Sequence, residues 1–90
     1  MPERAETLRY REDVLEHLLR HGVRPTSRTP PELVRTFVRD LYKYEIRLLR
    51  ARYVQGEFPK AEYARRVDAL RRRYPVLALH PREFLYTPSS

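Results

Sequence analysis

Apolar residues recur with a helical period along three stretches of the chain. In residues 3–21 the first turns are acidic, and Gly22 comes directly after the segment. One stripe of this segment is apolar: Leu8, Val14, Leu15, Leu18 and Leu19. Acids are favoured at the start of a helix, and a left-handed glycine is a common end. The pattern predicts a helix over residues 3–21.

The longest helical pattern covers residues 31–54. Before it, Thr29, Pro30 and Glu32 have the spacing of a capping box with a proline in the first turn. Apolar residues occupy more than half of the circumference: Leu33, Val34, Phe37, Val38, Leu41, Tyr42, Tyr44, Ile46, Leu48, Leu49 and Tyr53. A surface helix needs a narrower stripe, so this helix is expected to be central, with neighbours on two sides.

A tight reversal at residues 55–58 precedes the third helix, which starts at Pro59 and ends before Pro75. Its apolar positions follow a narrow stripe: Tyr63, Val67, Leu70 and Tyr74. A short connection favours an antiparallel pair of helices. The apolar residues after Pro75 predict a tail that covers the bundle, with one short turn near residues 81–84. We therefore expect an all-α, three-helix domain that spans residues 1–90.

Composition narrows the class of protein. The net charge is +7, and 17 of the 19 basic residues are Arg. Residues 24–90 carry the whole excess, about +8 against about −1 for residues 1–23, which favours one cationic surface and an acidic partner. The chain has no Cys and no apolar run near the ~18 residues of a membrane span. We expect a cytoplasmic protein without a cofactor and without a membrane partner. Few thermolabile side chains fit a heat-adapted source, although a GC-rich genome explains the Arg bias equally well.

Four cations share one face of the 31–54 helix: Arg39, Lys43, Arg47 and Arg50. Their steps of four, four and three residues stack them into a ridge. The opposite face is expected to be apolar, through Val34, Phe37, Val38, Leu41, Leu48 and Leu49. The third helix adds further arginines, among them Arg65, Arg66, Arg71, Arg72 and Arg73. Such cations bind phosphates, and Tyr53 and Tyr63 could stack on single-stranded bases. The alternative is a solvated charged face.

Glu45 lies in the middle of the apolar arc, where an unpaired carboxylate is costly. Arg52 has nearly the same angular position two turns later, and Arg11 interrupts the stripe of the 3–21 helix. We expect a buried ion pair that joins Glu45 to Arg52, to Arg11 or to both.

Catalytic and metal sites are not expected. One candidate metal site has ligands spaced four residues apart: Asp13, His17 and His21. A fourth ligand is lacking nearby in the sequence. The alternative is that these residues form the polar edge beside the apolar stripe. Two glycines cannot build a phosphate-binding loop, and no paired carboxylates converge. We expect a protein that is not an enzyme.

Residues 48–70 resemble the short helical hairpin called SHOCT. The positions that match are Gly56, Glu57, Phe58, Glu62, Tyr63 and Leu70, whereas Pro59 and Lys60 replace its usual Ser or Thr cap. The resemblance covers about a quarter of the chain and implies an interaction or oligomerisation module.

Two functions follow from these patterns. The first is attachment to an acidic partner, such as nucleic acid or a ribonucleoprotein, through the cationic ridge, Arg65, Arg66, Arg72 and Arg73. The alternative is a small assembly subunit or homo-oligomer, in which the wide apolar surface of the 31–54 helix meets another chain.

Overall fold

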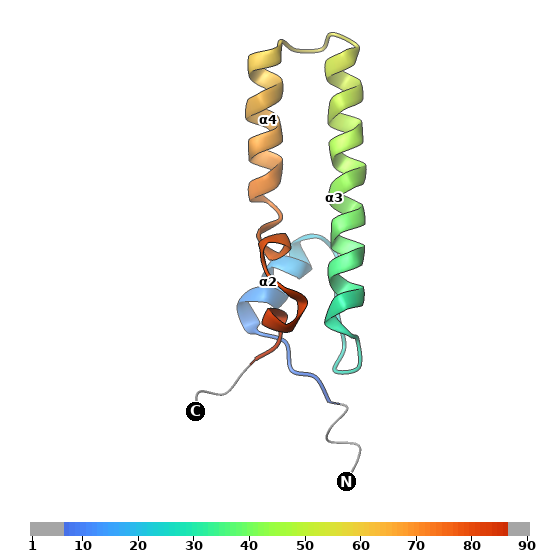
Figure 1. Ribbon diagram of the computed structural model, residues 1–90, viewed down its shortest axis with the longest axis vertical. Coiled ribbons are helices and arrows are strands. Elements are labelled where there is room, and N and C mark those ends of the chain that lie inside the picture. The colour runs from blue at the N-terminus through green and yellow to red at the C-terminus, as the bar shows by residue number, and fades with distance from the viewer. Residues whose placement is uncertain (1–6, 87–90) are drawn as a thin grey trace.

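The computed structural model describes residues 7–86 and has an all-α fold (Figure 1). Three α-helices occupy this part of the chain: α2 (Glu12–Arg20), α3 (Pro31–Val54) and α4 (Lys60–Arg72). Two 3₁₀ turns follow, η1 (Pro75–Ala78) and η2 (Pro81–Phe84). Helices α3 and α4 form an antiparallel hairpin, and α2 and the 3₁₀ turns pack beside the N-terminal half of α3. None of the helices in residues 7–86 combines the length and apolar character needed to cross a membrane.

The long helix and its hairpin are confirmed. Helix α3 covers residues 31–54 without a break, and α4 starts one residue after the expected Pro59. At the end of α3, Gly56 has a φ of 82°, which is the left-handed region that glycine adopts at low cost. The amides of Gly56 and Glu57 donate to the carbonyls of Tyr53 and Arg52 at 2.9 and 3.1 Å. This is the Schellman pattern, and it turns the chain toward α4.

The predicted 3–21 helix is wrong at its start. Residues 3–6 lie outside the described part, and α2 begins only at Glu12. The segment before it is extended: Tyr10 forms an antiparallel bridge with Leu85, and the Tyr86 amide donates to the Arg9 carbonyl at 2.7 Å. These backbone groups bond to the C-terminal tail, so they are not available for helical bonds. The predicted end is confirmed, because Gly22 follows α2 with a φ of 76°.

The predicted capping box at Thr29 and Glu32 is also wrong. The residue that precedes α3 is Pro30, and no side chain caps the helix. The Thr29 hydroxyl accepts instead from the Thr26 amide at 2.8 Å, within the preceding turn. A capping box does occur in η2. There His80 Nδ1 accepts from the Arg82 amide, and the Glu83 carboxylate accepts from the His80 amide at 2.7 Å.

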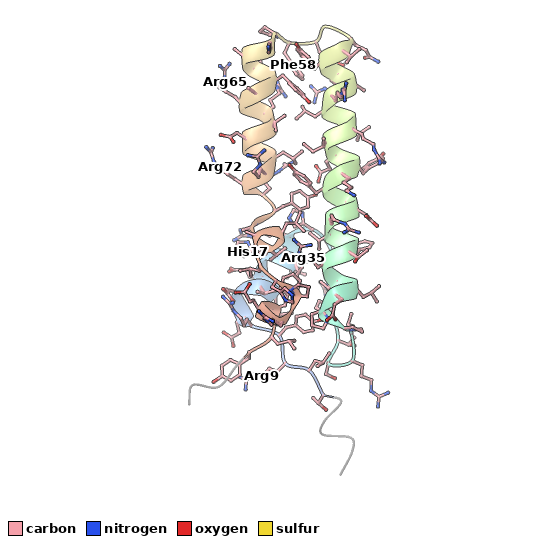
Figure 2. All side chains as sticks on the ribbon, viewed as in Figure 1. Arg9, His17, Arg35, Phe58, Arg65 and Arg72 are labelled. Atoms are coloured by element: carbon pink, nitrogen blue, oxygen red, sulfur yellow. The ribbon has the colours of Figure 1, made fainter. Side chains whose placement is uncertain are left out.

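The core lies where α2, the tail and the N-terminal half of α3 meet. The largest fully buried side chains are Phe84, Leu18, Val14, Val38 and Val76. The tail therefore completes the core, as the sequence predicts. At the other end of the hairpin, Phe58 is buried between α3 and α4 (Figure 2). The molecule is elongated, 59 by 22 by 17 Å, with a radius of gyration of 16.6 Å, whereas a compact chain of this length has roughly 12 Å.

Candidate nucleic-acid interface

The four ridge cations of α3 are all exposed. They lie roughly opposite the buried residues Val34, Val38 and Leu49, as the helical period requires. Within the described residues, Arg39 is the one ridge cation with an ion pair, to Asp40 at 3.9 Å. Within residues 7–86, Lys43, Arg47 and Arg50 have no ion pair or side-chain hydrogen bond. Because these three charges are not neutralised inside the chain, they remain available to an external anion.

The arginines of α4 do not extend this ridge. Arg65 and Arg72 project from the side of α4 that faces away from α3 (Figure 2). Three of the predicted binding residues are paired with acids: Arg66 with Glu62 at 2.6 Å, Arg72 with Asp68 at 3.2 Å and Arg73 with Glu45 at 3.1 Å. The ridge and the outer face of α4 are therefore two separate cationic surfaces.

The predicted partners of Glu45 are wrong. Arg52 pairs with Glu57 at 2.8 Å, and Arg11 pairs with Asp13 at 2.6 Å. Glu45 is reached instead from the end of α4, because Arg73 Nη2 donates to it at 3.1 Å and the Tyr74 hydroxyl donates to its other oxygen. The Glu45 side chain is also one-third exposed (32%), so this is not a buried ion pair.

Arg11 and Tyr74 are held by groups far away in the sequence. Arg11 Nη1 donates to the Glu83 carbonyl at 2.9 Å, which fastens the start of α2 to the tail. Its guanidinium also lowers the pKa of Asp13 through their hydrogen bond. Tyr74 is buried, and its ring stacks on His21 with a centroid distance of 4.1 Å. Burial and the hydrogen bond to Glu45 raise the pKa of Tyr74.

The aromatic rings at the hairpin tip pack against one another. Tyr53 and Tyr63 stack on each other, with centroids 4.5 Å apart and planes inclined by 16°. Tyr53 also stacks near Phe58, at 6.4 Å, and the guanidinium of Arg66 covers the Phe58 ring at 4.5 Å. These contacts hold α3 to α4. Stacking of Tyr53 and Tyr63 on single-stranded bases stays a prediction, with one face of each ring already covered by the other.

A basic hollow of about 380 Å³ lies where α2 and α4 end. It is lined by His17, Arg20, His21, Glu45, Arg72, Arg73 and Pro75. Cations are favoured at the carbonyl ends of helices, and the three arginines have acids nearby, Arg20 through Glu16 at 3.9 Å. These basic side chains therefore stabilise the carbonyl ends of α2 and α4.

His21, one of the three residues considered as metal ligands, is hydrogen-bonded to the Arg73 carbonyl at 2.6 Å. Between residues 7 and 86, no group of three or more His, Asp or Glu side chains is arranged to hold a metal ion.

The expected apolar face of α3 is only partly covered. Val34, Val38 and Leu49 are buried and Leu41 is half-buried, but Phe37 and Leu48 are exposed. Helix α4 and the 3₁₀ turns pack on one side of α3, so the expectation of neighbours on two sides is not met within residues 7–86. Sequence reasoning also missed Arg35, which donates to the carbonyls of Leu77 and Leu79 at 2.7 and 3.0 Å and holds the tail. The sequence feature that could have indicated this role is the position of Arg35 beside the apolar arc of α3.

Comparison with protein-family models, curated proteins and solved structures finds no match to this chain.

Proposed function

We propose that this protein is a non-enzymatic binding protein that attaches to a polyanion, most simply nucleic acid, through the α3 ridge of Arg39, Lys43, Arg47 and Arg50. One observation carries the proposal: three of these four exposed cations have no acidic partner in residues 7–86. Elsewhere, arginines such as Arg52, Arg66 and Arg73 are paired. Unpaired cations in a row attract phosphates, and they release condensed counterions when they bind.

The helical spacing of the ridge suits a phosphate backbone. The cations recur at nearly every turn of α3, which rises ~5.4 Å per turn. Their charges therefore form a line along a straight, rigid rod. Such a row binds backbone phosphates without reading base edges, so we expect affinity for nucleic acid with little sequence preference. In the hairpin of residues 48–70, which resembles SHOCT, Arg50 belongs to the ridge, and the remaining residues support the rod.

Charge removal on the ridge tests the proposal. We expect the triple variant Lys43→Gln, Arg47→Gln, Arg50→Gln to bind a labelled single-stranded oligonucleotide at least ~10-fold more weakly in low salt. Each lost phosphate contact removes about 0.7 from the slope of log affinity against log salt, so the slope should shrink by about 2. Fluorescence anisotropy over a salt series measures both quantities.

The matched control removes three exposed cations elsewhere: Arg24→Gln, Arg28→Gln, Lys60→Gln. None of these side chains has an ion pair in the part of the chain that the structure describes. Both variants have the same net charge, so the control should stay close to the wild-type protein in affinity and slope. Equal losses in the two variants would show that net charge alone causes binding. Absence of salt-dependent binding by the wild-type protein would reject the function itself.

A further inference from the structure

Helix α3 carries a second surface beside its ridge, an exposed apolar stripe formed by Leu33, Phe37, Tyr44 and Leu48. Their exposed fractions are 60%, 55%, 57% and 49%. Residues 7–86 contain seven large apolar side chains that are this exposed, and four of them are in this stripe. Single exposed apolar residues are normal, but an aligned row on one helix marks an interaction site.

The spacing of the stripe is symmetric. Its intervals are four, seven and four residues, so it reads the same from either end of α3. A two-fold interface requires such self-complementarity, because residue i must contact residue j while j contacts i. We propose that the stripe is a homodimer interface, in which α3 packs antiparallel against α3 of a second copy. Leu33 then lies opposite the second copy's Leu48, and Phe37 lies opposite its Tyr44.

Charges next to the stripe form a balanced cluster in the same register, because the two Asp40 side chains, ~1.5 Å apart along the axis, are flanked by the Lys43 of both copies. The two-fold axis passes between Asp40 and Leu41, so residues whose numbers sum to 81 lie level with each other. Asp40 then lies ~3 Å along the axis from Lys43 of the second copy, within reach of its ammonium group. Within residues 7–86 of one chain, the one ion pair of Asp40 is the long contact with Arg39 at 3.9 Å, and Lys43 has none. The symmetry provides two such pairs across the interface.

The dimer does not require polyanion binding, because the apolar stripe itself contains no cation. Lys43 is the one ridge cation that belongs to both proposals, and the dimer does not use Arg47 or Arg50, so either proposal can fail alone.

Sedimentation velocity of the full chain, over a series of concentrations without nucleic acid, tests the dimer. We expect the mass to rise toward twice 10.9 kDa with concentration. Leu48→Glu should weaken the dimer by at least ~100-fold, because the two-fold axis places a carboxylate against apolar side chains at two sites. Leu19→Glu is the matched control: Leu19 on α2 is 50% exposed, and this variant should dimerise as the wild-type protein does. Circular dichroism checks that both variants stay helical.

A charge swap tests the register. Phe37→Glu and Tyr44→Lys should each dissociate the dimer, whereas the double variant should regain at least ~10-fold of the lost affinity, because each introduced carboxylate faces an introduced ammonium. A double variant no stronger than the single ones would overturn the antiparallel register. A wild-type protein that stays monomeric at all concentrations, or a dimer that Leu48→Glu leaves intact, would overturn the interface.

Discussion

Glu45 shows what a single residue can and cannot reveal. Its place in the apolar arc of α3 correctly indicates that the carboxylate needs partners. The partners are 28 and 29 residues away, Arg73 and Tyr74, and not the neighbours in the helical pattern. Arg52 points to the hairpin tip and Arg11 to the tail, where each has its own acceptor. Local spacing identifies the demand for a partner, but only the packing of α4 on α3 supplies one.

The contribution of the hydrogen bond between Glu45 and Tyr74 to stability can be tested with single-residue variants. Tyr74 is 2% exposed as a whole residue, and Glu45→Ala leaves its part-buried hydroxyl without this acceptor. We expect the free energy of unfolding to fall by about 1–3 kcal/mol. In Tyr74→Phe the same Glu45→Ala change should cost clearly less, because no hydroxyl is left unpaired. Urea unfolding of the four proteins measures this coupling, and strictly additive effects would show that the bond contributes nothing.

At the scale of elements, the helices that need no distant partner were predicted best. Helix α3 starts and ends where the periodicity indicates, and Gly22 and Gly56 end their helices in the left-handed region. The start of α2 was placed too early, because residues 8–11 have helix-compatible side chains but give their backbone bonds elsewhere. The Leu8 amide donates to Ser27 and the Arg11 amide to Phe84. Such bonds depend on which segments meet, and no local pattern contains that information.

Arg35 joins two elements and provides a test of the tail. Its guanidinium donates to the carbonyls of Leu77 and Leu79 with two nitrogens, a geometry that one ammonium group cannot reproduce. Arg35 lies between α3 and these C-terminal turns (Figure 2). We expect Arg35→Lys to lower the free energy of unfolding by about 1–3 kcal/mol. Amide hydrogen exchange should show faster opening of η1 than of α4.

Arg39→Lys is the matched control for Arg35→Lys. It is the same change one turn further along α3, at an exposed side chain. Its effect should stay within about 0.5 kcal/mol. Equal effects of the two variants would show that the bonds of Arg35 do not hold the tail.

At the scale of the whole molecule, the tail closes a small core inside a long hairpin. Phe84 is fully buried near the end of the described chain, although Tyr86, two residues later, is 49% exposed. Phe84→Ala should cost about 3–5 kcal/mol, which is a large part of the ~5–15 kcal/mol that stabilises a domain. We expect all three helices to melt together at a much lower temperature, as followed by circular dichroism.

The control for Phe84→Ala is Tyr86→Ala, in the same tail. Tyr86 contacts the Arg9 guanidinium at 4.5 Å, so its loss should cost no more than about 1 kcal/mol. If Phe84→Ala melted only the tail and left α3 and α4 unchanged, the hairpin would be stable without this core.

The sequence by itself determined the all-α class, the rod of residues 31–54, the hairpin and the line of cations along the rod. These follow from periodicity and from glycine and proline, which act over a few residues. The tertiary structure decided which acids neutralise which arginines, where the extended N-terminal segment bonds, and which part of the apolar arc stays uncovered. Those outcomes depend on contacts between segments distant along the chain. For this reason the ridge of α3 was visible in the sequence, while the exposed stripe beside it emerged only when α4 and the tail were seen to pack on the other side.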